Sequence, residues 1–291
     1  MLVILDFDGT LTIEEAQAPM LARRAIQTLA REVLQLPVGQ VVAAYRRARG
    51  RILAAPQRYG WWVNGLLAGY ADEGAFQCNT STLLEMLGRE PGYAQAVAAR
   101  FPQAEYDPVV DCTNWLFHRH TAELAPAFRE TARPLLEALL AHPRRTPVVL
   151  TNSLGDKVAR QIETLGLGAP IEILGDTRQY DMDPHWPVTF EDPERGPVQV
   201  WQAAPERPID LRRPAYHAAL LAARRRDPAL AVVADTLSLP GALPLMMGIP
   251  FFLARTCYTP TWCIQAVEAH PLGRLLGSLD ELGPALDELE R

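Results

Sequence analysis

Asp6 and Asp8 are separated by one residue and followed by Gly9. They come directly after residues 2–5, an uninterrupted apolar run that is typical of a buried parallel strand. Gly9 permits a tight turn, which would let both carboxylates face one cavity. One carboxylate could attack as a nucleophile while the other donates or accepts a proton. The spacing therefore predicts nucleophilic and acid/base chemistry at the end of the first strand.

Polar side chains also follow two later apolar runs. Thr151 follows residues 147–150, and Asp235 follows residues 229–234. In open α/β sheets, ligands bind at the carboxyl ends of the strands, near the point where the strand order reverses. We therefore expect Asp6, Thr151 and Asp235 to converge at one end of a sheet, although they lie far apart in the sequence.

The elements that must hold these residues alternate between strand and helix. Apolar runs predict strands at residues 2–5, 147–150, 171–174, 229–234 and 249–254. Helical periodicity separates them, at residues 131–141, 154–165, 216–226 and 240–247. This alternation predicts an α/β fold, with a Rossmann-like parallel sheet that carries helices on both faces.

Two segments interrupt the alternation. Residues 15–128 show helical periodicity and no buried strand, which predicts an inserted α-helical cap domain. The core is then formed by residues 1–14 and 129–291. Residues 175–210 are rich in proline and aspartate, and they predict a small β-hairpin flap insertion in which runs 186–190 and 197–201 flank a turn.

The composition disfavours several classes of protein. Hydrophobic residues make up 48% of the 291 residues, yet no run of about 18 is apolar, so no membrane span is expected. The net charge of −6 disfavours nucleic-acid binding through a broad basic surface. The first residues lack the basic start of a signal peptide and the four cysteines form no CxxC pair, so a reduced, cytoplasmic setting is expected.

The sequence at residues 6–11, DFDGTL, resembles the DxDGT[LV] motif of the haloacid dehalogenase-like (HAD) hydrolases. The resemblance covers the predicted core and not the details of the insertions. It implies that Asp6 is a nucleophile that becomes an aspartyl-phosphate and that Asp8 is the general acid/base. Dehalogenase members usually lack the second aspartate, so Asp8 favours phosphoryl chemistry over carbon–halogen cleavage.

The second motif of this family is a threonine or serine that ends a strand. Thr151 in LTNS matches it and is followed by Asn152 and the predicted start of a helix. A hydroxyl and free N–H groups at a helix N-terminus form an anion site, as a transferring phosphoryl group requires. We expect Asn152 and Thr10, from the first motif, to bind the substrate.

The third motif is a lysine or arginine that usually precedes a proline and neutralises developing charge. Lys157 is the only lysine among the 28 basic residues, so an arginine is expected in this role. Arg213 precedes Pro214 and is the better match, and Arg212 is the alternative. A planar guanidinium can bridge carboxylate and phosphoryl oxygens, but it is larger than an ammonium.

The fourth motif is incomplete. The family typically has an aspartate after a strand and a second acid four or five residues later, which support Mg²⁺. Asp235 fits the first position, but Leu239 and Pro240 occupy the later ones. Mg²⁺ takes oxygen ligands and keeps several waters, so Asp6, Asp8 through its backbone carbonyl, and Asp235 are expected to hold it. The missing acid should weaken the affinity for the metal.

Together these residues predict a Mg²⁺-dependent phosphatase that acts on a small phosphorylated metabolite through an aspartyl-phosphate. The large cap disfavours a phosphoprotein as substrate. The missing acid leaves a second interpretation, a catalytically impaired HAD-derived binding or interaction protein, and a phosphotransferase or mutase is a third. Neither nucleic acid nor a membrane is expected as a partner, and the oligomeric state stays open.

Three other groups are expected to be structural. His118 and His120 have the spacing of metal ligands only if their segment is extended. Asp181 and Asp183 repeat the D-x-D spacing without a buried strand before them, so a turn is expected. A group of aromatic residues in the helical insertion is expected to pack in its core, with a substrate pocket as the alternative: Tyr59, Trp61, Trp62, Trp115 and Phe117.

Overall fold

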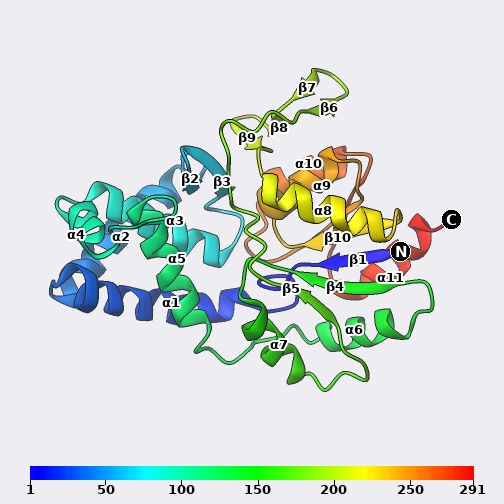
Figure 1. Cartoon of the computed structure of the whole chain (residues 1–291), viewed down its shortest axis with the longest axis horizontal. Helices are drawn as coiled ribbons and strands as arrows, with labels where there is room; N and C mark the ends of the chain where they lie inside the picture. The colour runs from blue at the N-terminus through cyan, green and yellow to red at the C-terminus, as the bar shows by residue number, and fades with distance from the viewer. The chain divides into compact units, whose positions relative to one another are not determined.

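The computed structural model describes all 291 residues, and the chain divides into two compact units. The larger unit comprises Met1–Ile13 and Pro126–Arg291, and the smaller comprises Glu14–Ala125. Figure 1 traces both along the chain. No helix in either unit combines the length and the apolar character that crossing a membrane requires.

A six-stranded sheet lies at the centre of the larger unit, in the order β12-β11-β10-β1-β4-β5, and all its neighbouring strands are parallel. The strands are β1 (Leu2–Leu5), β4 (Thr146–Leu150), β5 (Glu172–Leu174), β10 (Leu230–Ala234), β11 (Phe251–Ala254) and β12 (Gly273–Leu276). The predicted α/β fold class is confirmed. The sequence pattern does not reveal β12, because its four residues GRLL include an exposed arginine and form no apolar run.

Helices cover both faces of the sheet, as Figure 1 shows. They are α6 (Ala132–Ala141), α7 (Gly155–Glu163), α8 (Pro214–Arg226), η3 (Leu237–Gly241), α9 (Ala242–Met246), α10 (Thr261–Ala269), η4 (Leu279–Glu281) and α11 (Leu282–Leu289). One buried cluster joins α6, α7 and α11 to the face of the sheet that carries Leu5, Val149 and Val233. Because helices cover the other face as well, β1 is buried at every position.

The smaller unit is mainly helical, and its α-helices share one buried apolar cluster. They are α1 (Glu14–Thr28), η1 (Leu29–Leu34), α2 (Val38–Ala54), η2 (Pro56–Arg58), α3 (Ala75–Arg89), α4 (Tyr93–Arg100) and α5 (Pro108–Thr121). A hairpin of β2 (Gly60–Val63) and β3 (Leu66–Tyr70) also belongs to it. Its turn is Asn64-Gly65, both with positive φ, which is a strong hairpin signal that the expectation of a helical insertion overlooked.

The aromatic residues of the smaller unit differ in their surroundings. Trp115 and Phe117 pack edge-to-face against Phe101 and Phe76, as core packing predicts. Trp62 contradicts that prediction, because it is 46% exposed. Side chains alternate between the two faces of a strand, and Trp62 lies on the exposed face of β2.

His118 and His120 lie on α5, so the segment is helical and not extended. Residues two apart on a helix do not face each other, so this pair cannot share a metal in the way that the H-x-H spacing of an extended segment would allow. In the larger unit, the D-x-D pair of Asp181 and Asp183 lies in a turn, as expected, since the carboxylate of Asp183 accepts a hydrogen bond from the N–H of His185 at 2.8 Å.

The insertion after β5 contains two short hairpins. β6 (Phe190–Asp192) pairs with β7 (Gly196–Val198), and β8 (Val200–Ala204) pairs with β9 (Arg207–Asp210). The predicted β-hairpin insertion is therefore confirmed, with Phe190 of the first predicted run opposite Val198 of the second, but its strands have other bounds than expected and a second hairpin follows. The carboxylate of Asp192 accepts hydrogen bonds from the N–H groups of Glu194 and Arg195, which closes a tighter turn and moves the pairing.

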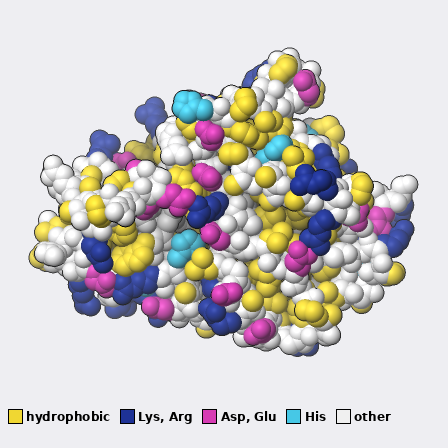
Figure 2. Space-filling view, in the orientation of Figure 1, with side chains coloured by type: hydrophobic (Ala, Val, Ile, Leu, Met, Phe, Trp, Pro, Cys, Tyr) yellow, Lys and Arg dark blue, Asp and Glu magenta, His cyan; other side chains and the backbone are white.

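Charges of both signs are mixed on the surface. On the face that Figure 2 shows, arginine and acidic side chains alternate with hydrophobic ones and form no broad area of one sign.

Candidate active site

The carboxyl end of the sheet, where the parallel strands finish, gathers the polar residues. The register places Leu5 of β1 level with Val233 of β10 and Val149 of β4. Asp6 follows directly, and its N–H donates to the carbonyl oxygen of Val233 at 2.9 Å. Thr151 follows the last residue of β4. The parallel register thus brings these strand ends to one side of the sheet.

Thr10 joins Asp6 to Asp235. The hydroxyl of Thr10 is buried and lies 3.2 Å from Oδ2 of Asp6 and 3.3 Å from Oδ1 of Asp235, so it can donate to either carboxylate. The same oxygen accepts the N–H of Asp235 at 3.0 Å. This contact fixes the end of β1 against the end of β10 across 225 residues of sequence.

Gly9 permits this close approach. Its φ is +81°, and a Cβ atom at this position would overlap the carboxylate of Asp235. Arg129 holds the turn from outside: its Nη2 and Nε donate to the carbonyl of Gly9 at 2.5 and 3.1 Å, and Nε lies 3.0 Å from the carbonyl of Thr10. Sequence reasoning missed Arg129, because nothing in its local pattern distinguishes it from other arginines.

The carboxylates repel one another. Burial, followed by the negative charges of Asp235 and Asp8, raises the pKa of Asp6 well above its usual range. A divalent cation would relieve this repulsion, and carboxylate and carbonyl oxygens are the ligands that Mg²⁺ prefers. The donor set of Asp6, Asp235 and the backbone carbonyl of Asp8 therefore fits Mg²⁺.

Ser153 and Lys157 contact Asp8 from the segment after β4. The hydroxyl of Ser153 donates to Oδ2 of Asp8 at 2.5 Å. Nζ of Lys157 lies 3.4 Å from Oδ1 of Asp8 and donates to the hydroxyl of Ser153 at 2.9 Å. The cation next to Asp8 is thus a lysine, whereas the sequence predicted an arginine as the cation of the third motif. The available signal was the position of the one lysine, in the first turn of the helix that follows LTNS.

Thr151 and Asn152 lie where β4 leads into α7. Thr151 is buried, and its hydroxyl accepts the N–H of Ser153 at 3.1 Å. Oδ1 of Asn152 accepts the N–H of Gln179 at 2.7 Å. Thr151 therefore shapes the loop before α7, and Asn152 joins this loop to the segment after β5. Their predicted roles with a substrate stay predictions.

Arg213 and Arg212 have different surroundings. Arg213 is fully buried and donates to the carbonyls of Asp210 and Gln179, each at 3.2 Å. Arg212 is bound to the carboxylate of Asp210, with Nη2 and Oδ2 2.5 Å apart, and donates to the carbonyl of Pro184. Arg213 is thus buried and Arg212 is paired with an acid next to the hairpins, and the choice of Arg213 for the third motif stays a prediction.

Tyr216 is a further buried group that sequence reasoning missed. Its hydroxyl has no hydrogen-bond partner. Burial, followed by the charge of Asp6, raises the pKa of Tyr216, while Arg213 acts in the opposite direction. Tyr216 therefore lies within electrostatic reach of both the predicted nucleophile and the predicted cation.

The segment after Asp235 is apolar. Leu239 and Pro240, at the positions where a second acid would stand, are both buried. The hydroxyl of Thr236 donates to the carbonyl of Leu239, within the same loop. No carboxylate from this segment can therefore complete a metal site.

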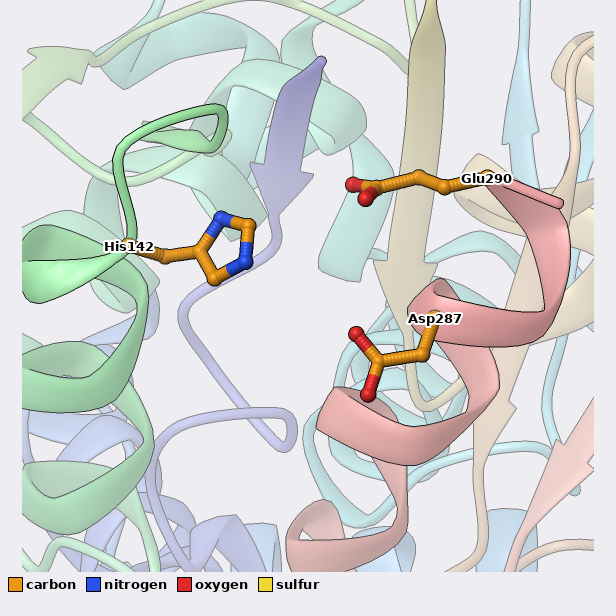
Figure 3. Close-up of side chains that lie close together, drawn as sticks. All are labelled: His142, Asp287 and Glu290. Atoms are coloured by element: carbon orange, nitrogen blue, oxygen red, sulfur yellow. The ribbon is translucent and has the colours of Figure 1, made fainter.

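Another acidic group lies at the amino end of the sheet. Ligand atoms of His142, Asp287 and Glu290 lie within 4.8 Å of one another, and Figure 3 shows the ring facing both carboxylates. Arg145, which directly precedes β4, pairs with both acids, and Nη2 of Arg144 lies 2.9 Å from Oε2 of Glu290. Two guanidinium groups thus neutralise two carboxylates, which identifies an ion-pair network that joins α11 to the start of β4.

Compared by sequence, the chain matches no protein-family model and no curated protein. Compared by structure, it resembles a predicted phosphatase from Clostridium acetobutylicum, with a TM-score of 0.51, 12% identity, and 99% of this chain and 98% of that chain covered. A predicted phosphoglycolate phosphatase from Haemophilus somnus gives 0.47 at 14% identity, with 98% and 97% covered. The HAD-hydrolase YfnB from Bacillus subtilis, bound to magnesium, gives 0.47 at 12% identity, with 98% of both chains covered.

The chain therefore shares its overall fold with the predicted phosphatase from Clostridium acetobutylicum. This fold has the parallel α/β sheet that the alternation of strands and helices predicts.

Proposed function

We propose that this protein is a HAD-type phosphatase that hydrolyses a small phosphomonoester through an aspartyl-phosphate on Asp6, with the helical unit as its cap domain. One observation carries the proposal. Asp6, at the end of the central strand, is tied to Asp235 through Thr10, and Asp8 lies two residues further on. A nucleophile, a proton carrier and a further carboxylate are the groups that phosphoryl transfer to an aspartate requires.

Each step uses a residue of this end of the sheet. Asp6 attacks phosphorus in line with the departing alcohol. Asp8 protonates the alcohol oxygen as its bond to phosphorus breaks, and then takes a proton from the water that hydrolyses the aspartyl-phosphate. Thr151 and the first N–H groups of α7 bind phosphoryl oxygens, and the guanidinium of Arg213 offsets their charge.

The oxygen donors favour Mg²⁺ as the cofactor. Asp6, Asp235 and the backbone carbonyl of Asp8 would hold it. When bound, it would supply positive charge to the phosphoryl oxygens. With Leu239 and Pro240 in place of a second acid, the affinity should be weak, so activity should depend on the concentration of added Mg²⁺.

The test is hydrolysis of p-nitrophenyl phosphate and a panel of small phosphomonoesters, with and without Mg²⁺. We expect Mg²⁺-dependent turnover that Asp6→Asn lowers by about 10³-fold or more, because the nucleophile is lost. Asp280→Asn, at an exposed position of η4, is the matched control and should retain full activity. An inactive parent chain, or an Asp6→Asn variant as active as the parent, would contradict the proposal.

A binding protein that has lost turnover is the second candidate, and the buried Leu239 and Pro240 favour it. It predicts that the chain binds a phosphorylated metabolite but does not cleave it, which calorimetry with the uncleaved ester would reveal. A phosphotransferase or mutase would be identified by recovery of the phosphoryl group on an alcohol instead of water.

A further inference from the structure

Two buried side chains to which the proposed function gives no role hold the carboxylate of Asp8. Ser153 lies 2.5 Å from one carboxylate oxygen, and Lys157 lies 3.4 Å from the other. Lys157 also donates to Ser153 at 2.9 Å, so the three side chains form a closed ring of contacts. Each oxygen of Asp8 thus has its own partner.

Lys157 is buried, so its ammonium group depends on partners within the protein. Lys157 is 5% exposed and Ser153 is 1% exposed, whereas the side chain of Asp8 keeps 18% of its surface accessible. An unpaired buried ammonium costs several kcal/mol, so a lysine is retained at such a position only with a carboxylate partner. Besides Asp8 and Ser153, the ammonium lies 5.8 Å from the centre of the Phe7 ring. Phe7 and Asp8 both belong to the segment that directly follows β1.

The backbone that carries Ser153 is anchored from β5. The carbonyl of Ser153 accepts the N–H of Asp176 at 2.9 Å. A Cβ atom on Gly175 would lie 2.9 Å from that carbonyl and would overlap the backbone of Gly155. Only glycine permits this packing, which fixes the start of α7 and with it the direction of the Ser153 hydroxyl.

We propose that Ser153 and Lys157 are positioning residues that fix the carboxyl group of Asp8 for proton transfer to the leaving alcohol, an inference that rests on the proposed role of Asp8. Asp8 gives its proton to the bridging oxygen as the P–O bond breaks, and that oxygen keeps the electron pair. The carboxylate that remains is stabilised by the ammonium and the hydroxyl. In the second step Asp8 takes a proton from the attacking water, and Asp6 leaves as a carboxylate.

The dependence on the leaving group tests this role. p-Nitrophenolate can leave as an anion without being protonated, whereas an alkyl alcohol leaves readily only when its oxygen is protonated as the P–O bond breaks. We therefore expect Ser153→Ala and Lys157→Met to lower kcat for an alkyl phosphate such as glycerol phosphate about 10²-fold more than kcat for p-nitrophenyl phosphate, and Ser153→Thr to restore much of the loss. Ser278→Ala, which removes a hydroxyl before η4, is the control and should change neither rate. Equal losses on both substrates would overturn the proposal, since a merely structural role affects both alike.

A second readout does not need turnover. Because Lys157 is the only lysine, labelling with ¹⁵N-lysine gives a single side-chain resonance. Asp8→Asn should shift it, and Asp280→Asn should not. A resonance whose chemical shift does not change in Asp8→Asn would overturn the proposal. A shifted resonance in a chain without phosphatase activity would support the contact with Asp8 and contradict the proposed function, so the two failures are distinguishable.

Discussion

The two ends of the same sheet each gather acidic side chains, but with opposite electrostatics. At the amino end, hydrogen bonding to Arg145 is the main cause that lowers the pKa of Glu290. At the carboxyl end, burial and two neighbouring carboxylates raise the pKa of Asp6. Acids that are paired with arginines stabilise the fold, as at the amino end, whereas the unbalanced negative charge around Asp6 is the feature on which the proposed function rests.

Replacing Gly9 should cause the largest effect, because it disrupts the turn that places Asp6 and Asp8 beside Asp235. Gly9→Ala introduces backbone strain at φ +81° and an overlap with Asp235, so we expect a loss of about 3 kcal/mol in unfolding free energy together with loss of activity. Gly166→Ala is the matched control: its φ is also positive, at +61°, but the space around it is open. It should cost about 1 kcal/mol and leave activity intact. Urea denaturation and the phosphatase assay measure both, and equal effects would contradict the overlap.

Replacing Arg145 should destabilise the amino end of the sheet and leave catalytic activity unchanged. Arg145 is 5% exposed and bound to two acids, whereas Arg144 is 71% exposed and bound to one. We expect Arg145→Met to cost about 2 kcal/mol, because it leaves Glu290 without its main partner, and Arg144→Met to cost about 0.5 kcal/mol or less. Thermal unfolding measures the difference. A loss of turnover in Arg145→Met that exceeds its loss of folded protein would show that this end is not purely structural.

Neutralising one acid at each end should change stability in opposite directions. The protonated carboxyl of Asp6 stabilises the fold below the ordinary pKa of aspartate, and this contribution is lost as the pH rises through its raised pKa. The ionised Glu290 contributes above the ordinary pKa of glutamate, and this is lost as the pH falls through its lowered pKa. At pH 7, Asp6→Asn should therefore raise Tm and Glu290→Gln should lower it.

The pH dependence sharpens that test. The Tm difference between each variant and the parent chain should become smaller as the pH falls. Added Mg²⁺ should reduce the difference for Asp6→Asn, because it stabilises the parent chain. A Tm that falls for Asp6→Asn at pH 7 would show that the carboxyl end is not under electrostatic strain.

The smallest effect is expected at Tyr216. Its hydroxyl has no hydrogen-bond partner and is buried near Asp6, so Tyr216→Phe removes a polar group that the fold does not use. We expect stability to change by less than about 1 kcal/mol, with a gain in Tm if anything. An increase in KM for the phosphate ester at unchanged stability would identify the hydroxyl as a ligand contact. A large loss of stability would show that the hydroxyl is bonded in solution.

The parts of the site that the sequence predicts are those in which local pattern and topology coincide. Asp6 and Gly9 belong to one recognisable pattern of four residues. Asp235 follows a strand whose end a parallel sheet must place next to the end of the first strand. Buried parallel strands are also easy to predict, because they are apolar at every position.

The partners of Asp8 and of the Gly9 turn could not be predicted in this way. Arg129 lies 120 residues from Gly9, and Lys157 lies 149 residues from Asp8. Their contacts depend on how one loop packs on another, and neither has a sequence pattern of its own. The bounds of the hairpins between β5 and α8 could not be predicted for a related reason, since the side chain of Asp192 closes the turn and its effect on register is visible only in the structure.

The central place of β1 has a consequence for the order in which the protein is made. β1 is synthesised before both strands with which it pairs, β4 and β10, and Leu5 meets Val233 only after residue 233 has been translated. The helical unit has its own buried cluster and is complete by residue 125, so it can fold while β1 still lacks both neighbours. A nascent chain that stalls before residue 146 would therefore present an unpaired apolar strand, the kind of segment that chaperones bind and that aggregates.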